Sequence, residues 1–439
     1  MNQSRTTPLV CAVVCASALC TLPAFAGGDR PVINVEGARI QAYPIAIAPA
    51  MGEQVSGQAI AQVLAADFDR SGLFKVLNPD SFLADPKTEG LTPDKIDFNK
   101  WTTVGAAGLV KLQAFVTDKE VKVEFHLYDS ARAAQILSGT YSSPHAGLRQ
   151  IAHRFADDVV KYFTQQPGDF ETRIAYVRHT ESGKQIVIAD SDGFNAQALT
   201  GASINLLPAW APDGKSLAFT TFRDGAAHIY SVDASSRAIT PLVLMGDFAT
   251  GASYAPDGLR FTFSASRDDN TDVYLSQSDG SAGRQLTDAR GIDISASWSP
   301  DGKQLAFISD RAGSPQLYLM NADGTNQRRL TFKGNYNQEP AWSPKGDLIA
   351  FSGRDEKRMF DIYTVAVASG EIKRLTGNAG TNEKPTWSPS GRTLMFVSSR
   401  SGKRQLWTMT FDGNAQRQLT NEPMGASDPA WGPASGDKK

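Results

Sequence analysis

The chain has 439 residues, with 44 lysine and arginine residues against 46 aspartate and glutamate residues and a net charge of −2. These charges are spread evenly, which excludes a nucleic-acid-binding protein that relies on a basic surface. A chain of this length can form two hydrophobic cores. All three cysteines, Cys11, Cys15 and Cys20, lie within the first 26 residues. The remainder therefore predicts neither a disulfide nor a cysteine nucleophile.

Residues 1–26 have the pattern of a secretory signal peptide. A short start with one charge, at Arg5, precedes an apolar run that begins at Leu9, and Ala24-Phe-Ala26 provides a small-x-small cleavage site. The run is too short to span a bilayer, and no cysteine lies in the context of a lipid-attachment site. We therefore predict a mature chain that starts near Gly27 and lies in the periplasm, where a protein without cysteines is unexceptional.

Residues 27–165 do not repeat and predict a small α/β domain. Apolar residues at helical spacing predict helices over Gly57–Ser71 and Leu148–Phe163. Residues 109–116 and 121–127 predict a hairpin. Further strands are expected at 37–41, 44–49 and 74–77. Gln165-Gln-Pro-Gly168 predicts the linker to the rest of the chain.

One phrase recurs through the rest of the chain. It is Trp210-Ala-Pro-Asp-Gly-Lys215 at its first occurrence and Trp298-Ser-Pro-Asp-Gly-Lys303 at its third. The aromatic positions are separated by 44, 44, 44, 45 and 44 residues, which is the period of one four-stranded propeller blade. These positions are Trp210, Tyr254, Trp298, Trp342, Trp387 and Trp431, of which Tyr254 begins the most divergent copy.

Each repeat predicts four short strands joined by tight turns. In the third repeat, the strand that ends at Trp298 is followed by strands at 304–308, 316–320 and 328–331. Pro presets φ and Gly accepts a positive φ, so the Pro-Asp-Gly and Asn-Ala-Asp-Gly segments between them are turns. Four strands in this order predict an antiparallel meander, which is one blade.

The ends of the repeat region settle the number of blades. Residues 173–200 supply three strands without a first one, and Asp428-Pro-Ala-Trp431 supplies a first strand with nothing after it. Joined in one sheet, they complete a six-bladed propeller over 170–439, and this closure removes exposed sheet edges. The fold class predicted is an N-terminal α/β domain followed by a six-bladed β-propeller.

Three further features have structural interpretations. An arginine recurs at blade spacing and is expected to bond nearby turn carbonyls or acids instead of an anionic ligand. His153 is expected to be a structural histidine, and Asp190-Ser-Asp192-Gly193 a hairpin turn, because it lacks the rest of a calcium loop. The recurring arginines are Arg223, Arg267, Arg311, Arg354 and Arg400.

Taken together, the signal peptide, the α/β domain and six such blades in this order resemble the TolB family of the Tol-Pal system. The stretches Arg149–Asp157, Gly168–Val177 and Val123–Asp129 carry the resemblance more specifically than the blade phrase. It implies a non-enzymatic adaptor that binds the peptidoglycan-associated lipoprotein Pal through the propeller and TolA through the start of the mature chain. It also implies a role in outer-membrane integrity and in invagination during cell division.

The expected Pal-binding surface is the propeller face formed by the crossovers from each fourth strand to the next first strand. Such loops vary between repeats, as recognition loops do. The resemblance assigns this role to Phe248, Gly251 and Ile294. Polarity and position near the canal mouth add five residues: Asn337, Glu339, Asn382, Glu383 and Asp428.

The TolA segment is expected at the flexible start of the mature chain, which could add a strand to a partner. Its candidate contacts are Asp29, Arg30, Val32 and Ile33.

Two alternatives stay open at this point. An enzyme is disfavoured, because the Gly-x-Ser-x-Gly and His-Glu-x-x-His patterns are absent. A propeller that binds a small glycan or peptide in its canal would not need the segment Gly27–Val35. We expect a monomer without cofactor, with Ca²⁺ bound by acidic crossover residues as the alternative.

Overall fold

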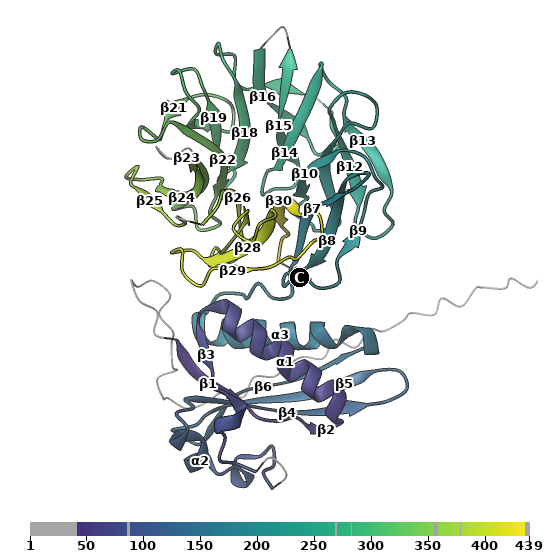
Figure 1. Cartoon of the computed structure of the whole chain (residues 1–439), viewed down its shortest axis with the longest axis vertical. Helices are drawn as coiled ribbons and strands as arrows, with labels where there is room; N and C mark the ends of the chain where they lie inside the picture. Colours follow the sequence, from purple (N-terminus) through teal and green to yellow (C-terminus); the bar gives the residue numbers. More distant parts are fainter. Residues whose placement is uncertain are drawn as a thin grey trace, which may run out of the picture. The chain divides into compact units, whose positions relative to one another are not determined.

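The computed structural model describes residues 42–85, 88–267, 270–281, 283–354, 359–377 and 379–434. The predicted signal peptide and the proposed TolA contacts Asp29, Arg30, Val32 and Ile33 lie outside the described residues, so both stay predictions. Within the described ranges, no helix has both the length and the apolar character needed to cross a membrane. Figure 1 shows an α/β region followed by a ring of small sheets, which confirms the predicted fold class.

The α/β region is built on one mixed sheet with the strand order β3-β1-β4-β5-β6, and β2 pairs with β4. Strand β1 runs parallel to both β3 and β4, whereas β4, β5 and β6 form an antiparallel meander. The strands are β1 Tyr43–Ile47, β2 Met51–Gly52, β3 Phe74–Val76, β4 Gly108–Val116, β5 Val121–Asp129 and β6 Ala134–Ser143.

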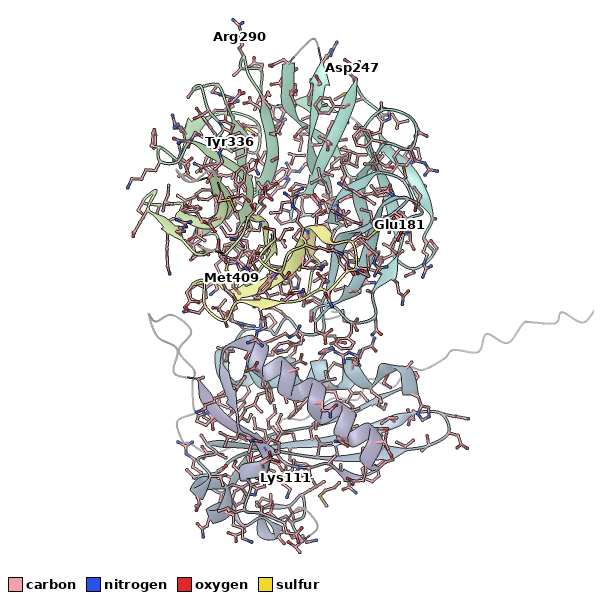
Figure 2. All side chains as sticks on the ribbon, viewed as in Figure 1. Lys111, Glu181, Asp247, Arg290, Tyr336 and Met409 are labelled. Carbon is pink, nitrogen blue, oxygen red and sulfur yellow. The ribbon has the colours of Figure 1, made fainter. Side chains whose placement is uncertain are left out.

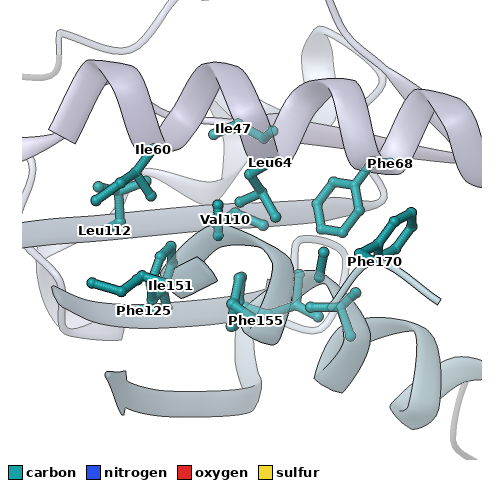
Figure 3. Packing of buried hydrophobic residues seen from close by; sticks show 14 of the residues in the cluster. Ile47, Ile60, Leu64, Phe68, Val110, Leu112, Phe125, Ile151, Phe155 and Phe170 are labelled. Carbon is teal, nitrogen blue, oxygen red and sulfur yellow. The ribbon is translucent and has the colours of Figure 1, made fainter. Parts of the chain in front are cut away.

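Two long helices, α1 (Gln54–Ser71) and α3 (Leu148–Thr164), share one core with the sheet. Figure 3 shows Ile60, Leu64 and Phe68 of α1 directed at the strands, as their helical spacing predicts. Helix α1 begins three residues before the predicted start. The Glu53 carboxylate caps it by accepting hydrogen bonds from two backbone N–H groups of the first turn.

The opposite face of the sheet is covered by a short segment that the sequence did not predict. It contains α2 (Phe98–Thr103), and Trp101 of this helix shares a hydrophobic cluster with Ala46 of β1 and Leu109 of β4. Lys111 (Figure 2) is buried there and donates to Glu89 at 2.9 Å, and Trp101 donates to the same carboxylate at 3.1 Å. Charges as deeply buried as these persist because they are paired and hydrogen-bonded.

The repeats form six four-stranded antiparallel sheets. Five of them take their strands in chain order: β10-β11-β12-β13, β14-β15-β16-β17, β18-β19-β20-β21, β22-β23-β24-β25 and β26-β27-β28-β29. The innermost strands are β10 Asn205–Trp210, β14 Phe248–Tyr254, β18 Asp293–Trp298, β22 Tyr336–Trp342, β26 Asn382–Trp387 and β30 Ala426–Trp431. The second strands are β11 Ser216–Thr221, β15 Arg260–Arg267, β19 Gln304–Ser309, β23 Leu348–Arg354, β27 Thr393–Ser398 and β7 Arg173–Thr180.

The fourth strands, at the outer edge of each blade, are the shortest, whereas the third strands are as long as the inner ones. The third strands are β12 His228–Asp233, β16 Asn270–Gln277, β20 Gln316–Asn321, β24 Phe360–Ala366, β28 Gln405–Thr410 and β8 Gly183–Asp190. The fourth strands are β13 Ile239–Val243, β17 Arg284–Gln285, β21 Arg328–Arg329, β25 Ile372–Arg374, β29 Arg417–Gln418 and β9 Gln197–Ala198.

The sixth sheet joins both ends of the repeat region in the order β30-β7-β8-β9. Strand β30 pairs antiparallel with β7, and Trp431 lies opposite Ile174. The blade aromatics pack inside and between sheets. Trp298 is 6% exposed and donates to the carbonyl of Ser253 in the preceding blade at 3.0 Å. The closure and the packing role predicted for these residues are therefore both present.

Candidate partner-binding face

Every innermost strand carries a β-bulge at the same position. Its ladder shifts register around the residue three before the blade aromatic, and that residue has a positive φ in all six blades. A bulge re-aims the side chain at its site, and positive φ is unusual for residues other than glycine. We call these six positions the bulge ring: Leu207, Gly251, Ser295, Glu339, Lys384 and Asp428, with φ between 50° and 69°.

Three consecutive blades contribute charged residues to the bulge ring. The Lys384 ammonium forms an ion pair with Asp428 of the next blade and lies 4.0 Å from Glu339 of the preceding one. Glu339 also accepts hydrogen bonds from the Ser352 hydroxyl at 2.7 Å and the Lys384 backbone N–H at 2.9 Å. Side chains from three blades meet only if they point toward the propeller axis, so this charged half fills part of the canal.

Burial and charge set the protonation of this group. Burial raises the pKa of Glu339 against the opposing effect of Lys384. Burial by itself lowers the pKa of Lys384, but the carboxylates of Asp428 and Glu339 outweigh it and raise that pKa. The ammonium is therefore firmly held, and any cation that entered this half of the canal would have to compete with it.

The other three blades form an uncharged half of the bulge ring. The Gly251 N–H donates to the Thr220 hydroxyl of the preceding blade at 3.2 Å, and the Ser295 N–H donates to the Ser264 hydroxyl at 3.2 Å. A Cβ atom at Gly251 would meet only Leu207, at 4.0 Å. This half therefore presents small and apolar groups without an internal ion pair.

The three residues assigned by family resemblance lie in the uncharged half. Phe248 begins β14 and is partly exposed, three residues before Gly251 in the bulge ring. Ile294 is half-buried and immediately precedes Ser295 of the ring. The structure thus places them on two consecutive blades, with Ile294 partly packed against the hydrophobic core next to it. A contact with a partner stays a prediction for these three residues.

The five residues added from polarity lie in the charged half, and each has an intramolecular partner. Asn337 and Asn382 are buried and donate to Gln316 at 2.9 Å and to Asp361 at 2.8 Å. These bonds fix the crossovers to the third strands. Glu383 accepts from Arg404 at 2.9 Å, and Glu339 and Asp428 hold Lys384. A contact with a partner stays a prediction for these five residues.

The rim of the crossover face is apolar in several places. Figure 2 shows Asp247 and Arg290, from two successive crossovers, at the outer end of this face. Large hydrophobic side chains are exposed beside the polar ones, as at protein-binding sites. They are Ile204, Phe222, Ile292, Phe332 and Met424.

A second polar cluster lies away from this face. His153 is buried; its Nδ1 lies 2.7 Å from Asp67 and its Nε2 3.6 Å from Asp192. Among the described residues, these three side chains are the one group with the spacing of metal ligands. Arg70 and Arg149 pair with the two carboxylates, so the charge is already neutralised. The turn predicted at 190–193 is confirmed, with the Gly193 N–H donating to the Asp190 carbonyl at 2.9 Å.

Comparison with known protein families decides the classification. The model of the TolB beta propeller domain matches residues 160–435, and that of the TolB amino-terminal domain matches residues 31–136. The chain belongs to the TolB family. This is not a known enzyme family.

Individual relatives agree with this classification. The chain is 43% identical over 231 residues to the Tol-Pal system protein TolB of Anaeromyxobacter dehalogenans strain 2CP-1, covering 52% of this chain and 53% of that protein. The TolB of Myxococcus xanthus is 41% identical over 215 residues, covering 47% and 49%. These alignments span about half the length of the curated relatives.

Among solved structures, TolB from Acinetobacter baumannii superposes with a TM-score of 0.80 at 28% identity, covering 90% of this chain and 97% of that one. The fold is therefore shared over almost the whole described chain.

Sequence reasoning missed Lys384, the centre of the charged half. The signal that could have found it is positional, because Lys384 lies three residues before Trp387, as Glu339 and Asp428 lie before their own tryptophans.

Proposed function

We propose that this TolB-family protein is a non-enzymatic adaptor of the Tol-Pal system in the periplasm. It would bind the soluble domain of the peptidoglycan-associated lipoprotein Pal with its crossover face and TolA with the segment Gly27–Val35. In this role it would support outer-membrane integrity and invagination during cell division. The relatives are named as TolB proteins of the Tol-Pal system, which supports a role in this system. The predicted signal peptide supports a location in the periplasm.

The observation that carries the Pal-binding proposal is the uncharged half of the bulge ring. Phe248, Gly251 and Ile294 lie there without competing internal ion pairs. A partly exposed aromatic anchor beside small residues and polar crossovers is the usual anatomy of a binding hot spot. We also propose that the canal works without a resident metal, since the Lys384 ammonium already occupies the place between the carboxylates of Glu339 and Asp428.

Calorimetry with the soluble domain of the Pal lipoprotein from the same organism tests this function. Saturable one-to-one binding is expected, unchanged by Ca²⁺. Phe248→Ala should weaken binding by roughly 1–4 kcal/mol without unfolding the protein. Leu259→Ala is the matched control, because Leu259 is an exposed apolar residue of the same blade in a turn on the opposite loop face, and it should leave the affinity unchanged.

Three outcomes would contradict parts of this proposal. Unchanged affinity of Phe248→Ala would remove this residue from the site. Binding that depends on Ca²⁺ would show a metal site. Absence of binding in both conditions would favour a small ligand in the canal. Deleting 27–35 tests the TolA contact separately, since it should abolish TolA binding and leave Pal binding intact.

A further inference from the structure

In two blades, the recurring arginine donates side-chain hydrogen bonds to residues of its own blade. In the blade β18–β21, Arg311 donates three side-chain hydrogen bonds, at 2.6 to 2.8 Å, to Asp293, Gln327 and Ser309. In the blade β26–β29, Arg400 donates in the same way to Asn382, Gln416 and Ser398. The predicted bond to a nearby acid is confirmed for Arg311, whose partners include Asp293, whereas Arg400 bonds amide and hydroxyl groups instead of turn carbonyls or acids.

The same arginine in the blade β10–β13, Arg223, has lost this arrangement. Arg223 lies thirteen residues after Trp210, as Arg311 lies thirteen after Trp298. Ile239, however, occupies the position of the glutamine and cannot accept a hydrogen bond. Among the described contacts, the Arg223 guanidinium has no hydrogen bond or ion pair, and its one contact is with the Tyr230 ring at 5.3 Å.

A cavity of about 410 Å³ lies beside this arginine. The crossover that borders it is the shortest of the set: Thr200 lies ten positions before Trp210, whereas Thr331 lies eleven positions before Trp342. Hydroxyl groups of Thr200, Ser203 and Thr221 line the cavity together with Arg223 and the apolar Ile239.

The charged side chains in this cavity and the apolar residues beside it indicate which ligand it can bind. Asp224 also lines it, but its carboxylate accepts a hydrogen bond from the Tyr230 hydroxyl instead of pairing with Arg223. Ile204 and Phe222 are 49% and 41% exposed and are next in sequence to residues that line the cavity. An unpaired guanidinium is a fork of donors that matches a carboxylate, and exposed apolar neighbours suit a protein surface.

We propose that this cavity, the Arg223 pocket, binds the carboxylate of an aspartate or glutamate side chain on the protein that docks on the crossover face. The proposal rests on the adaptor function above and extends it with a specificity-determining contact. The two guanidinium N–H groups would bind both carboxylate oxygens, while the pocket hydroxyls satisfy the remaining lone pairs. Ile204 and Phe222 would pack against the apolar surroundings of that acidic residue.

The first test probes the pocket without any protein partner. Side-chain ¹⁵N resonances of the arginines are followed during titration with acetate and with acetamide, its neutral counterpart. The Arg223 Nε–H signal, assigned from Arg223→Gln, should shift saturably with acetate only. Arg311 provides the internal control, because its three donors are already occupied. An Arg223 signal that responds no more than that of Arg311, or equally to acetamide, overturns the pocket.

The second test measures partner affinity by calorimetry with the soluble Pal domain. Arg223→Gln should weaken binding by about tenfold or more and reduce its dependence on salt. Lys215→Gln makes the same change of charge in an exposed turn of the opposite loop face and should have no effect. Each acidic surface residue of the Pal domain is then changed to its amide, and one of these changes should lose its effect in the Arg223→Gln background.

The outcomes separate this inference from the adaptor function. Unchanged affinity of Arg223→Gln, with wild-type binding intact, overturns the pocket as a partner contact and leaves the adaptor role standing. Absence of wild-type binding overturns the adaptor role, whereas a selective acetate response in the same protein would still support the carboxylate site.

Discussion

The two halves of the propeller have the same backbone arrangement at the bulge ring. They differ in whether the side chains there are charged and paired with one another. At the bulge ring, Lys384 pairs with Glu339 and Asp428, whereas Leu207, Gly251 and Ser295 present no charge. A second contrast separates single blades and not the two halves: the guanidinium groups of Arg311 and Arg400 have hydrogen-bond partners and that of Arg223 has none among the described contacts, although Arg311 and Arg223 both belong to blades of the uncharged half. The repeat therefore supplies the same backbone in every blade, and departures from its side-chain pattern mark the places where we propose that a partner binds.

The largest expected effect comes from breaking the closure on which the charged half depends. A chain that ends at Gly425 lacks β30, and with it Asp428 and the pairing with β7. We expect the propeller to lose its cooperative thermal transition, a loss comparable to the whole stability of a domain, about 5–15 kcal/mol. A chain that ends at Pro433 keeps β30 and should melt like the wild type. Equal melting of both chains would contradict the closure.

Removing the central charge should come next. Lys384→Met leaves the carboxylates of Glu339 and Asp428 without their ammonium partner, which should cost roughly 3–5 kcal/mol of unfolding free energy. Ser295→Ala at the equivalent position of the uncharged half should change that free energy by less than about 0.5 kcal/mol. Denaturant unfolding measures both variants, and equal costs would show that the two halves do not differ energetically.

The contribution of the recurring arginine to stability is expected to differ between two blades. Arg311→Gln removes three charge-assisted hydrogen bonds within its blade and should lower the unfolding free energy by about 1–3 kcal/mol. Arg223→Gln removes no such bond and should be neutral within about 0.5 kcal/mol. The same unfolding assay decides, and a destabilised Arg223→Gln protein would show that this arginine has a structural partner.

The smallest effect is a dependence on pH that belongs to the charged half. Because burial raises the pKa of Glu339, the folded protein retains a proton at pH values where the unfolded chain has lost it. Stability should therefore fall as pH rises from about 4.3, the ordinary value for glutamate, through the raised pKa, by at most about 1.4 kcal/mol per pH unit.

Glu339→Gln should flatten this slope in unfolding curves recorded across that range. Glu422→Gln, which alters the carboxylate paired with Arg178, serves as the matched control. An unaltered slope for Glu339→Gln would assign the pH dependence elsewhere.

The sequence predicts the frame of this molecule better than its binding surface. The blade strands can be predicted from the turns between them. Pro300 fixes its own φ and Gly302 adopts a φ of 67°, so few backbone conformations are possible at this turn. Strand β6 and helix α2 were missed, since β6 alternates between half-buried and exposed residues and α2 has only six residues. Neither presents a strong apolar period.

The burial of two candidate residues on the crossover face escaped prediction for a different reason. Asn337 and Asn382 are polar and precede innermost strands, so exposure near the canal was the natural expectation, yet both are buried. The bulge two residues later interrupts the alternation of faces, and a bulge does not appear in residue types. Arg223 could be located from sequence, but its missing partners become visible only when the blades are compared in three dimensions.

The pairing of β30 with β7 also determines when the propeller can close during synthesis. Strand β7 is synthesised about 250 residues before its neighbour, so its edge stays unpaired until β30 arrives, and such edges invite aggregation. Contacts this distant in sequence also form slowly. Since Asp428 arrives with β30, the Lys384 ion pair and the ring are completed in one event, and a prematurely terminated product would lack both.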